Sequence, residues 1–278
     1  MAAATPDSSA ARPTAASAPP VAPLAPKASP PTPLSGSVRT TGASRVPSVR
    51  ALDWVARGFT KVVGDVEVAT GDVTGTLAVG GTVTAQRLDL SGTHRIEGDV
   101  RISEGLRTHG TFRTGKGVTA RAVHWNGTIE VGGGVTVSQL LQWKGSLDVG
   151  QDVVADTVLF EGRLTIQGTL TARSISGEIQ SLSSVREIMG DWIEVRKRKA
   201  LPPIFLLPPP RWDELTVQRI EAKEVHLAGV RVRQLKADRI FLGPDVHVEF
   251  VEGTILQRHK DAHVGPESES PPPPGLSR

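Results

Sequence analysis

The stretch from Gly110 to Gly150 reads GTFRTGKGVTARAVHWNGTIEVGGGVTVSQLLQWKGSLDVG, and it holds short apolar runs separated by glycine. Within each run the apolar residues lie two apart, as Ile129 and Val131 do. A period of two places such residues on one face of a β-strand. A helix is disfavoured because glycine and β-branched residues dominate the stretch. The stretch therefore predicts short strands joined by glycine corners.

The same pattern extends in both directions as an internal repeat. Six opening glycines recur at intervals of about 17–18 residues: Gly75, Gly92, Gly110, Gly127, Gly145 and Gly162. Three strands and three corners in about 17–18 residues describe one coil of a solenoid, in which strands of successive coils stack in parallel. No proline occurs in the 154 residues 48–201, as expected where proline would remove a ladder hydrogen bond. We therefore expect an all-β, single-stranded parallel β-helix.

Two columns of this repeat carry residues that are not plain aliphatic side chains. Two residues before the later opening glycines stand Leu90, Thr108, Trp125, Trp143 and Phe160. An exposed platform for carbohydrates or nucleobases is one interpretation, but we favour packing inside a wide corner, because the column alternates in phase with the apolar positions. His94 also occupies an inward position. Either it is a buried, hydrogen-bonded histidine or it marks a local register shift, and we expect the shift because Ile96 can serve as the anchor.

The 21 prolines divide the 278 residues into parts. Residues 1–50 are rich in Ala, Pro and Ser, and have too few large apolar groups to offset the cost of ordering the backbone. We expect them to form a disordered tail, followed by a β-helix domain over 51–258 and a second disordered tail over 259–278. A basic, apolar and proline-rich insertion at about 190–212 interrupts the domain.

The insertion combines four consecutive cations with an apolar tetrad. One interpretation is that it contacts an anionic membrane surface, and the other is that the tetrad packs on the flank of the solenoid. Nucleic-acid binding is not expected, since no aromatic residues are interleaved with the cations and the net charge is only +3. The candidate membrane contacts are Arg196, Lys197, Arg198, Lys199, Ile204, Phe205, Leu206 and Leu207.

The residue types needed for chemistry are absent or scattered. The chain has no Cys, which excludes disulfides, thiolate metal sites and Cys nucleophiles. The seven His share no strand face with carboxylates at ligand spacing, and no Ser/His/Asp set has a recognisable context. We therefore expect no catalytic, cofactor-binding or metal site, and no enzymatic activity. No apolar run could span a bilayer and no secretory signal is visible, so we expect a cytoplasmic protein, peripheral at the inner face of the membrane.

Several segments of this chain resemble the bactofilins, the polymer-forming bacterial cytoskeletal proteins, and in particular their longer form. The resemblance covers about residues 60–256 and is carried by Ile96–Val100, Gly110–Phe112, Gly127–Ile129, Gly168–Ala172, Leu215–Leu227 and Ile240–Glu252. It implies a right-handed β-helix that assembles end to end into non-polar filaments without nucleotide. It also implies a scaffold at the membrane, in cell shape, cell-wall synthesis or appendage assembly. The N-terminal tail departs from the family, because it lacks the short apolar and cationic start of some members.

The ends of a solenoid give this expectation a physical basis, since each end exposes unpaired backbone groups and apolar core to another copy. The candidate polymerisation residues are Val62, Val66, Val68, Val246, Val248 and Phe250. Trp54, Val55 and Phe59 could instead cap the first coil. Beyond a homo-polymer, cell-wall or morphogenesis proteins are candidate partners of the proline-rich tails.

Two other classes of function compete with the scaffold. A left-handed hexapeptide acyltransferase needs strict six-residue spacing, whereas the step from Gly127 to Gly134 is longer than six and the step from Gly145 to Gly150 is shorter. An exported adhesin or polysaccharide-binding solenoid needs a secretory signal. We therefore expect a structural protein.

Overall fold

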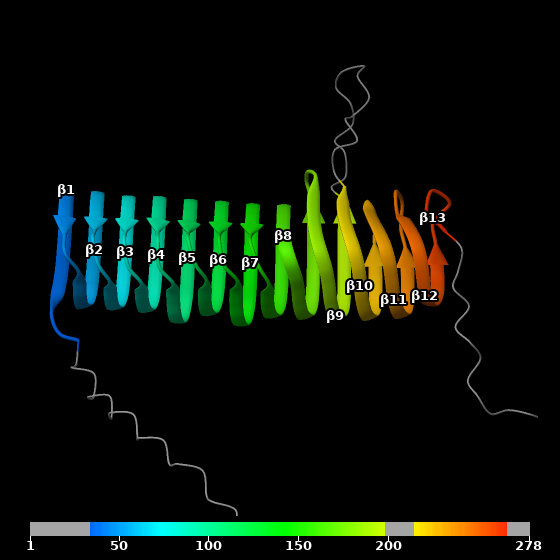
Figure 1. Cartoon of the computed structure of the whole chain (residues 1–278), viewed down its shortest axis with the longest axis horizontal. Helices are drawn as coiled ribbons and strands as arrows, with labels where there is room; N and C mark the ends of the chain where they lie inside the picture. The colour runs from blue at the N-terminus through cyan, green and yellow to red at the C-terminus, as the bar shows by residue number, and fades with distance from the viewer. Residues whose placement is uncertain (1–33, 198–213, 266–278) are drawn as a thin grey trace, which may run out of the picture. The chain divides into compact units, whose positions relative to one another are not determined.

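A computed structural model of the chain describes residues 34–197 and 214–265, which form one sheet of 13 strands and contain no helix. Every strand pairs in parallel with the next one along the chain, so the coils stack in sequence order along one axis (Figure 1). The predicted all-β parallel solenoid is confirmed. The strands are β1 (Ser37–Val46), β2 (Val49–Val62), β3 (Val66–Val79), β4 (Val83–Ile96), β5 (Val100–Thr114), β6 (Val118–Val131), β7 (Val135–Val149), β8 (Val153–Ile179), β9 (Ser183–Lys197), β10 (Leu215–Leu227), β11 (Val230–Leu242), β12 (His247–Arg258) and β13 (His263–Val264).

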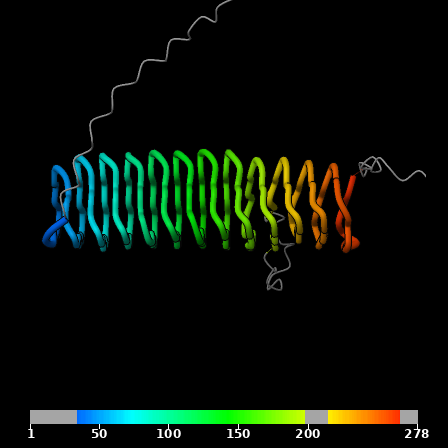
Figure 2. The backbone as a smooth tube through the Cα atoms, turned by 90° about the horizontal axis from the view of Figure 1, so that it is seen from below, coloured from blue at the N-terminus to red at the C-terminus, as the bar shows by residue number. Residues whose placement is uncertain are grey.

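The backbone winds through successive coils (Figure 2), and a typical strand corresponds to most of one coil, because the backbone stays paired as it turns each corner. The register between neighbouring coils gives the coil length. Val83 pairs with Val100, and Val100 pairs in turn with Val118. The coil length in this part of the stack is therefore the one that the glycine spacing predicts.

One corner of the coils is made by a column of glycines in direct register, which we call the glycine ladder. Its members have φ between +70° and +136°, a range that L-residues rarely adopt. A Cβ on Gly127 would overlap the carbonyl oxygen of Gly110 in the coil before it. Both backbone conformation and close stacking thus require glycine. The ladder consists of Gly42, Gly58, Gly75, Gly92, Gly110, Gly127, Gly145 and Gly162.

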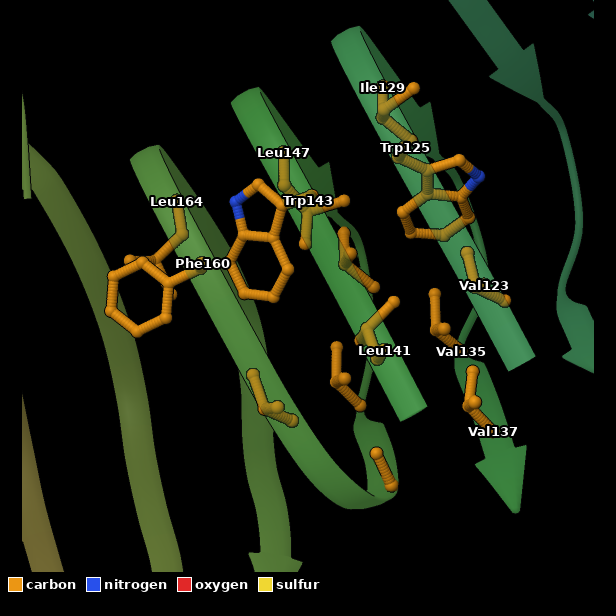
Figure 3. Close-up of a cluster of buried hydrophobic side chains, with 14 of the residues drawn as sticks. Val123, Trp125, Ile129, Val135, Val137, Leu141, Trp143, Leu147, Phe160 and Leu164 are labelled. Atoms are coloured by element: carbon orange, nitrogen blue, oxygen red, sulfur yellow. The ribbon is translucent and has the colours of Figure 1, made fainter. Parts of the chain in front are cut away.

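The core is a continuous file of apolar side chains along the stack, part of which is drawn in Figure 3. Leu141 and Leu147 are fully buried. Trp143 stacks on Phe160 with ring centroids 5.1 Å apart and planes 12° apart, and both rings are buried. The aromatic column is therefore internal packing, as the phase of the repeat indicates, and it is not an exposed platform.

The expected register shift at His94 is wrong. His94 pairs in register with Leu77 before it and Phe112 after it, and its side chain is fully buried. The irregularity between β4 and β5 lies instead between Ala85 and Arg87. The glycine ladder holds His94 in the inward column whatever its polarity, because Gly92 fixes the corner two residues earlier.

The predicted domain boundaries need correction. The β-helix begins at β1 and not at residue 51, so residues 37–50 are not a tail. Residues 190–197 belong to β9 and not to an insertion, and β13 lies beyond the predicted end at 258. The strand over residues 37–46 was not predicted, because it is rich in small Ser, Thr and Ala side chains and few of its residues point into the core. The predictions for residues 1–33, 198–213 and 266–278 lie outside the described residues.

Candidate assembly surfaces at the ends of the solenoid

The N-terminal end of the described stack is β1, which pairs with residues Asp53–Val62 of β2. No other strand of the described residues lies beyond β1, so its outer edge presents a row of backbone N–H and C=O groups. Val38 and Val46 pack against the core but remain only partly buried. This end thus combines an open strand edge with incompletely covered core side chains.

β1 covers only part of the first complete coil. Its pairing with β2 begins at Asp53, and Val49–Leu52 of β2 precede that ladder. Leu52 N donates a hydrogen bond of 2.9 Å to the carbonyl oxygen of Gly36. The N-terminal end is therefore stepped, with part of the coil one layer shorter than the rest.

The C-terminal end of the described stack is formed by β12 and the two-residue strand β13. β13 pairs only with His247 and Val248 of β12. Among the described residues, no strand pairs with the outer edge of residues 252–258. Ile255 and Val264 are only partly buried against the core. The C-terminal end is therefore stepped and open in the same way.

The candidate end residues on the N-terminal side lie inside the stack, so their assignment is wrong. Val62 pairs with Val46 of β1, Val66 pairs with Val49, and all three candidates, Val68 included, are at most 2% exposed. The physical reason is that β1 and β2 add coils before them. Trp54 is buried within β2 in the same way and is not a cap.

The candidate residues on the C-terminal side differ from one another. Val246 and Val248 are buried, and Val248 lies beneath Val264 of β13. Phe250 belongs to β12 and is 46% exposed, because it and Glu249 both lie outside the core between the buried Val248 and Val251. Of these three, only Phe250 is accessible in the described structure.

The candidate membrane residues fall at the limit of the described chain. Arg196 and Lys197 are the last two residues of β9. Arg196 forms an ion pair with Glu194, and Lys197 Nζ lies 3.1 Å from Asp245 Oδ2. Arg198, Lys199 and the tetrad 204–207 lie outside the described residues, so lipid contact by this segment stays a prediction.

An aromatic cluster that the sequence did not indicate lies on the outer surface of β9–β11. His226 stacks on Phe241 with ring centroids 4.2 Å apart, and Trp192 lies beside His226 at 6.2 Å. Glu224 forms a hydrogen bond of 2.7 Å with His226, which lowers the pKa of that carboxyl, and it also pairs with Arg239. The cluster borders a depression of about 200 Å³, and its charges are matched among themselves. Only His226 and Phe241 are partners in the register, whereas Trp192 is the partner of Glu224, so the repeat in the sequence does not align the three rings.

Within residues 34–197 and 214–265 no three His, Asp or Glu side chains are grouped so that they could hold a metal ion. No helix long and apolar enough to cross a bilayer occurs in the same ranges. Comparisons of the chain with protein-family models, with curated proteins and with solved structures give no match.

Proposed function

We propose that this chain is a non-enzymatic structural protein whose solenoid ends stack on other copies to form filaments that act as a scaffold. The observation that carries the proposal is that both described ends are open. Core side chains remain only partly buried at each end of the part of the chain that the structure describes: Val38 and Val46 at one end, Ile255 and Val264 at the other.

Inside the stack, each further coil supplies backbone hydrogen bonds and apolar contacts to the coil before it. β1 and β2 are joined over ten residue pairs, and each internal hydrogen bond contributes on the order of 1 kcal/mol net. A second copy stacked on an end would form a comparable ladder and would also bury the partly exposed valines and isoleucine. No nucleotide is needed for such a contact, because the energy comes from backbone pairing and apolar burial.

The resemblance to the bactofilins supports the same proposal and extends it. It leads us to propose assembly on the cytoplasmic side of the membrane, in cell shape, cell-wall synthesis or appendage assembly. It further leads us to propose non-polar filaments, in which like ends meet. The coils at the two ends have the same length, since the step from Ser37 to its partner Asp53 equals that from His247 to His263. Coil length therefore favours neither like nor unlike ends, and the proposal that like ends meet rests on the resemblance alone.

The test uses electron microscopy and sedimentation velocity on the full chain, with a lysine placed at one end at a time. Val46→Lys and Val264→Lys add a charge to a partly buried end position. If like ends meet, each single variant should stop at dimers and the double variant at monomers. Val154→Lys is the matched control, because Val154 is 44% exposed in β8 in the middle of the stack, and its filaments should be unchanged.

Two outcomes would contradict parts of this proposal. Compact wild-type monomers at every protein and salt concentration would overturn end-to-end assembly. If both single variants are monomers, end-to-end assembly still holds, but unlike ends meet in the filament. Thermal unfolding of each variant separates loss of assembly from loss of fold.

A further inference from the structure

The first two coils carry an excess of positive charge. Residues 34–63 contain five cations and one acid, Asp53, so their net charge is +4, whereas the whole chain has +3. The five cations are Arg39, Arg45, Arg50, Arg57 and Lys61. Arg50 pairs with Glu67, but Arg45, Arg57 and Lys61 form no ion pair with any described residue. The excess is thus both local and unneutralised.

Exposed apolar side chains lie among these cations. After the ladder glycine at 58, Phe59, Lys61 and Val63 alternate with the buried Thr60 and Val62, so the three share one outer face. Phe59 is 48% exposed and Val63 is 49% exposed. Large apolar groups half open to water on a charged face indicate an interaction surface.

The neighbouring coils complete this surface. Arg45 of β1 stands beside Lys61 in the register, and Arg57 lies at the corner next to Gly58. A depression of about 460 Å³ opens beside Lys61, because Ala78 and Gly80 of the following coil are small. We call Arg45, Arg57, Phe59, Lys61 and Val63 the N-terminal lateral patch.

The character of the same face changes further along the stack. The column of Phe59 continues as Thr76, Thr93, Thr111 and Thr128. The column of Lys61 continues through Ala78 to two arginines that are paired with glutamates, and then becomes acidic. Its members after Lys61 are Ala78, Arg95, Arg113, Glu130 and Asp148. The patch is therefore confined to the first coils and is not a general property of the face.

We propose that the N-terminal lateral patch binds the surface of an anionic lipid bilayer. Unpaired cations are attracted to the negative leaflet, and an exposed phenylalanine beside them can enter the boundary between head groups and acyl chains. A nucleic-acid backbone would use the cations but would leave Phe59 and Val63 in water. The patch lies on the side of the stack and leaves the outer edge of β1 free, so binding does not depend on end-to-end assembly.

The principal experiment is flotation of the full chain with vesicles, since filaments sink and only lipid-bound protein rises. The vesicles are phosphatidylcholine alone, or phosphatidylcholine with about a third phosphatidylglycerol. Wild type should float only with the anionic vesicles, and less at high salt. The triple variant Arg45→Gln, Arg57→Gln, Lys61→Gln should lose about 100-fold in partitioning, since each cation near the leaflet contributes about 5-fold.

The matched control removes the same charge elsewhere. Arg121, Arg163 and Arg186 are exposed, lie farther along the stack and form no ion pair with described residues. Their triple replacement by glutamine should lower partitioning about 5-fold or less. Thermal unfolding and filament formation without lipid should be unchanged in both triple variants, which separates this proposal from that of end-to-end assembly.

A second readout locates the contact on the molecule. The chain has no Cys, so the variants Phe59→Cys and Thr128→Cys can each be labelled with a single environment-sensitive fluorophore. The two labelled positions belong to the same column of the stack. When anionic vesicles are added, the fluorescence emission should shift to shorter wavelengths only for the label at position 59. Equal responses of both labels, undiminished flotation of the patch variant, equal flotation with neutral vesicles, or binding to duplex DNA in place of vesicles would each overturn the proposal.

Discussion

The coils of β2–β8 and those of β10–β12 share a core of alternating apolar residues but turn their corners differently. In the first region the glycine ladder sets the longer coil, in which Val83 pairs with Val100. In the second region the coil is shorter, and Leu215 pairs with Val230. Two regions with the same kind of core thus differ both in coil length and in their corners.

The two kinds of corner differ in how strictly they demand glycine. Gly127 has φ of +124°, far from the left-handed helical region, and its neighbour's carbonyl oxygen occupies the place of a Cβ. Gly229 and Asp245 have φ of +68° and +56°, which asparagine and aspartate adopt at modest cost. The three atoms nearest to a Cβ on Gly229 all belong to the side chain of Lys197, the nearest at 2.9 Å. Gly253 of β12 is a strict corner within the second region, with φ of +135° and a carbonyl oxygen of the preceding coil at its Cβ position, but it is a single glycine. The repeated strict corner of the first region is thus visible in the sequence, whereas the corners of the second region form no such repeat.

The largest expected effect comes from breaking the glycine ladder. Gly127→Ala should lower the free energy of unfolding by about 4 kcal/mol, because it adds steric overlap to an unfavourable φ. Gly229→Asn, at a corner of the second region, should cost about 1 kcal/mol. Gly105→Ala is the control, since nothing lies within 4 Å of its Cβ position and its φ is ordinary. Guanidinium unfolding measures all three, and equal losses for the two corners would contradict the distinction.

Lowering the pH should cause an intermediate loss of stability, and the loss should arise in the first region. His94 is buried between apolar neighbours, and neither ring nitrogen has a hydrogen-bond partner of good geometry among the described residues. Burial lowers the pKa of His94 from 6.5 to about 4, with the Ser91 backbone opposing part of the shift. The unfolded chain therefore gains the proton first, and stability falls as the pH drops from about 6.5 to about 4, by at most about 3 kcal/mol.

The replacement His94→Leu should remove this part of the acid sensitivity. Leucine matches Leu77 in the preceding coil, so the variant should also be at least as stable as wild type at pH 7. Guanidinium unfolding at pH 7 and at about pH 4 gives the comparison. Hydrogen exchange would show whether the loss in wild type centres on β4 and β5, and an identical pH profile of the two proteins would rule out His94 as its source.

The smallest effect is expected from the ion pairs on the outer surface, and here the two regions should behave alike. Arg113 lies 2.8 Å from Glu130 in the first region, and Arg231 lies 3.0 Å from Glu214 in the second. The arginine side chains are 57% and 58% exposed, so each pair is screened by water. Arg113→Gln and Arg231→Gln should each cost about 0.5 kcal/mol or less in thermal unfolding. A loss above about 2 kcal/mol in either would show that surface charge, and not corners, distinguishes the regions.

Most of the fold could be predicted from the spacing of glycines and the alternation of apolar residues. The first strand, β1, was not predicted because residues 37–46 have small side chains. Gly42 nevertheless continues the glycine ladder, in register with Gly58. The shift expected at His94 was wrong because stacking enforces register even on a polar residue. The patch around Phe59 could not be predicted, since only the folded stack shows that Phe59 and Val63 stay exposed and that Arg45 of the preceding coil lies beside Lys61.

The spacing of glycines and apolar residues was enough to specify a parallel solenoid. Each corner and each alternating pair depends on neighbouring residues, and their repetition allows one way of stacking. The position of the ends, and the side chains left uncovered there, depend on the folded stack as a whole. Val46 and Val62 are both valines of the same inward column, yet one is partly exposed at an end and the other is fully buried. Their burial depends on whether another coil lies beyond them, which no residue encodes alone.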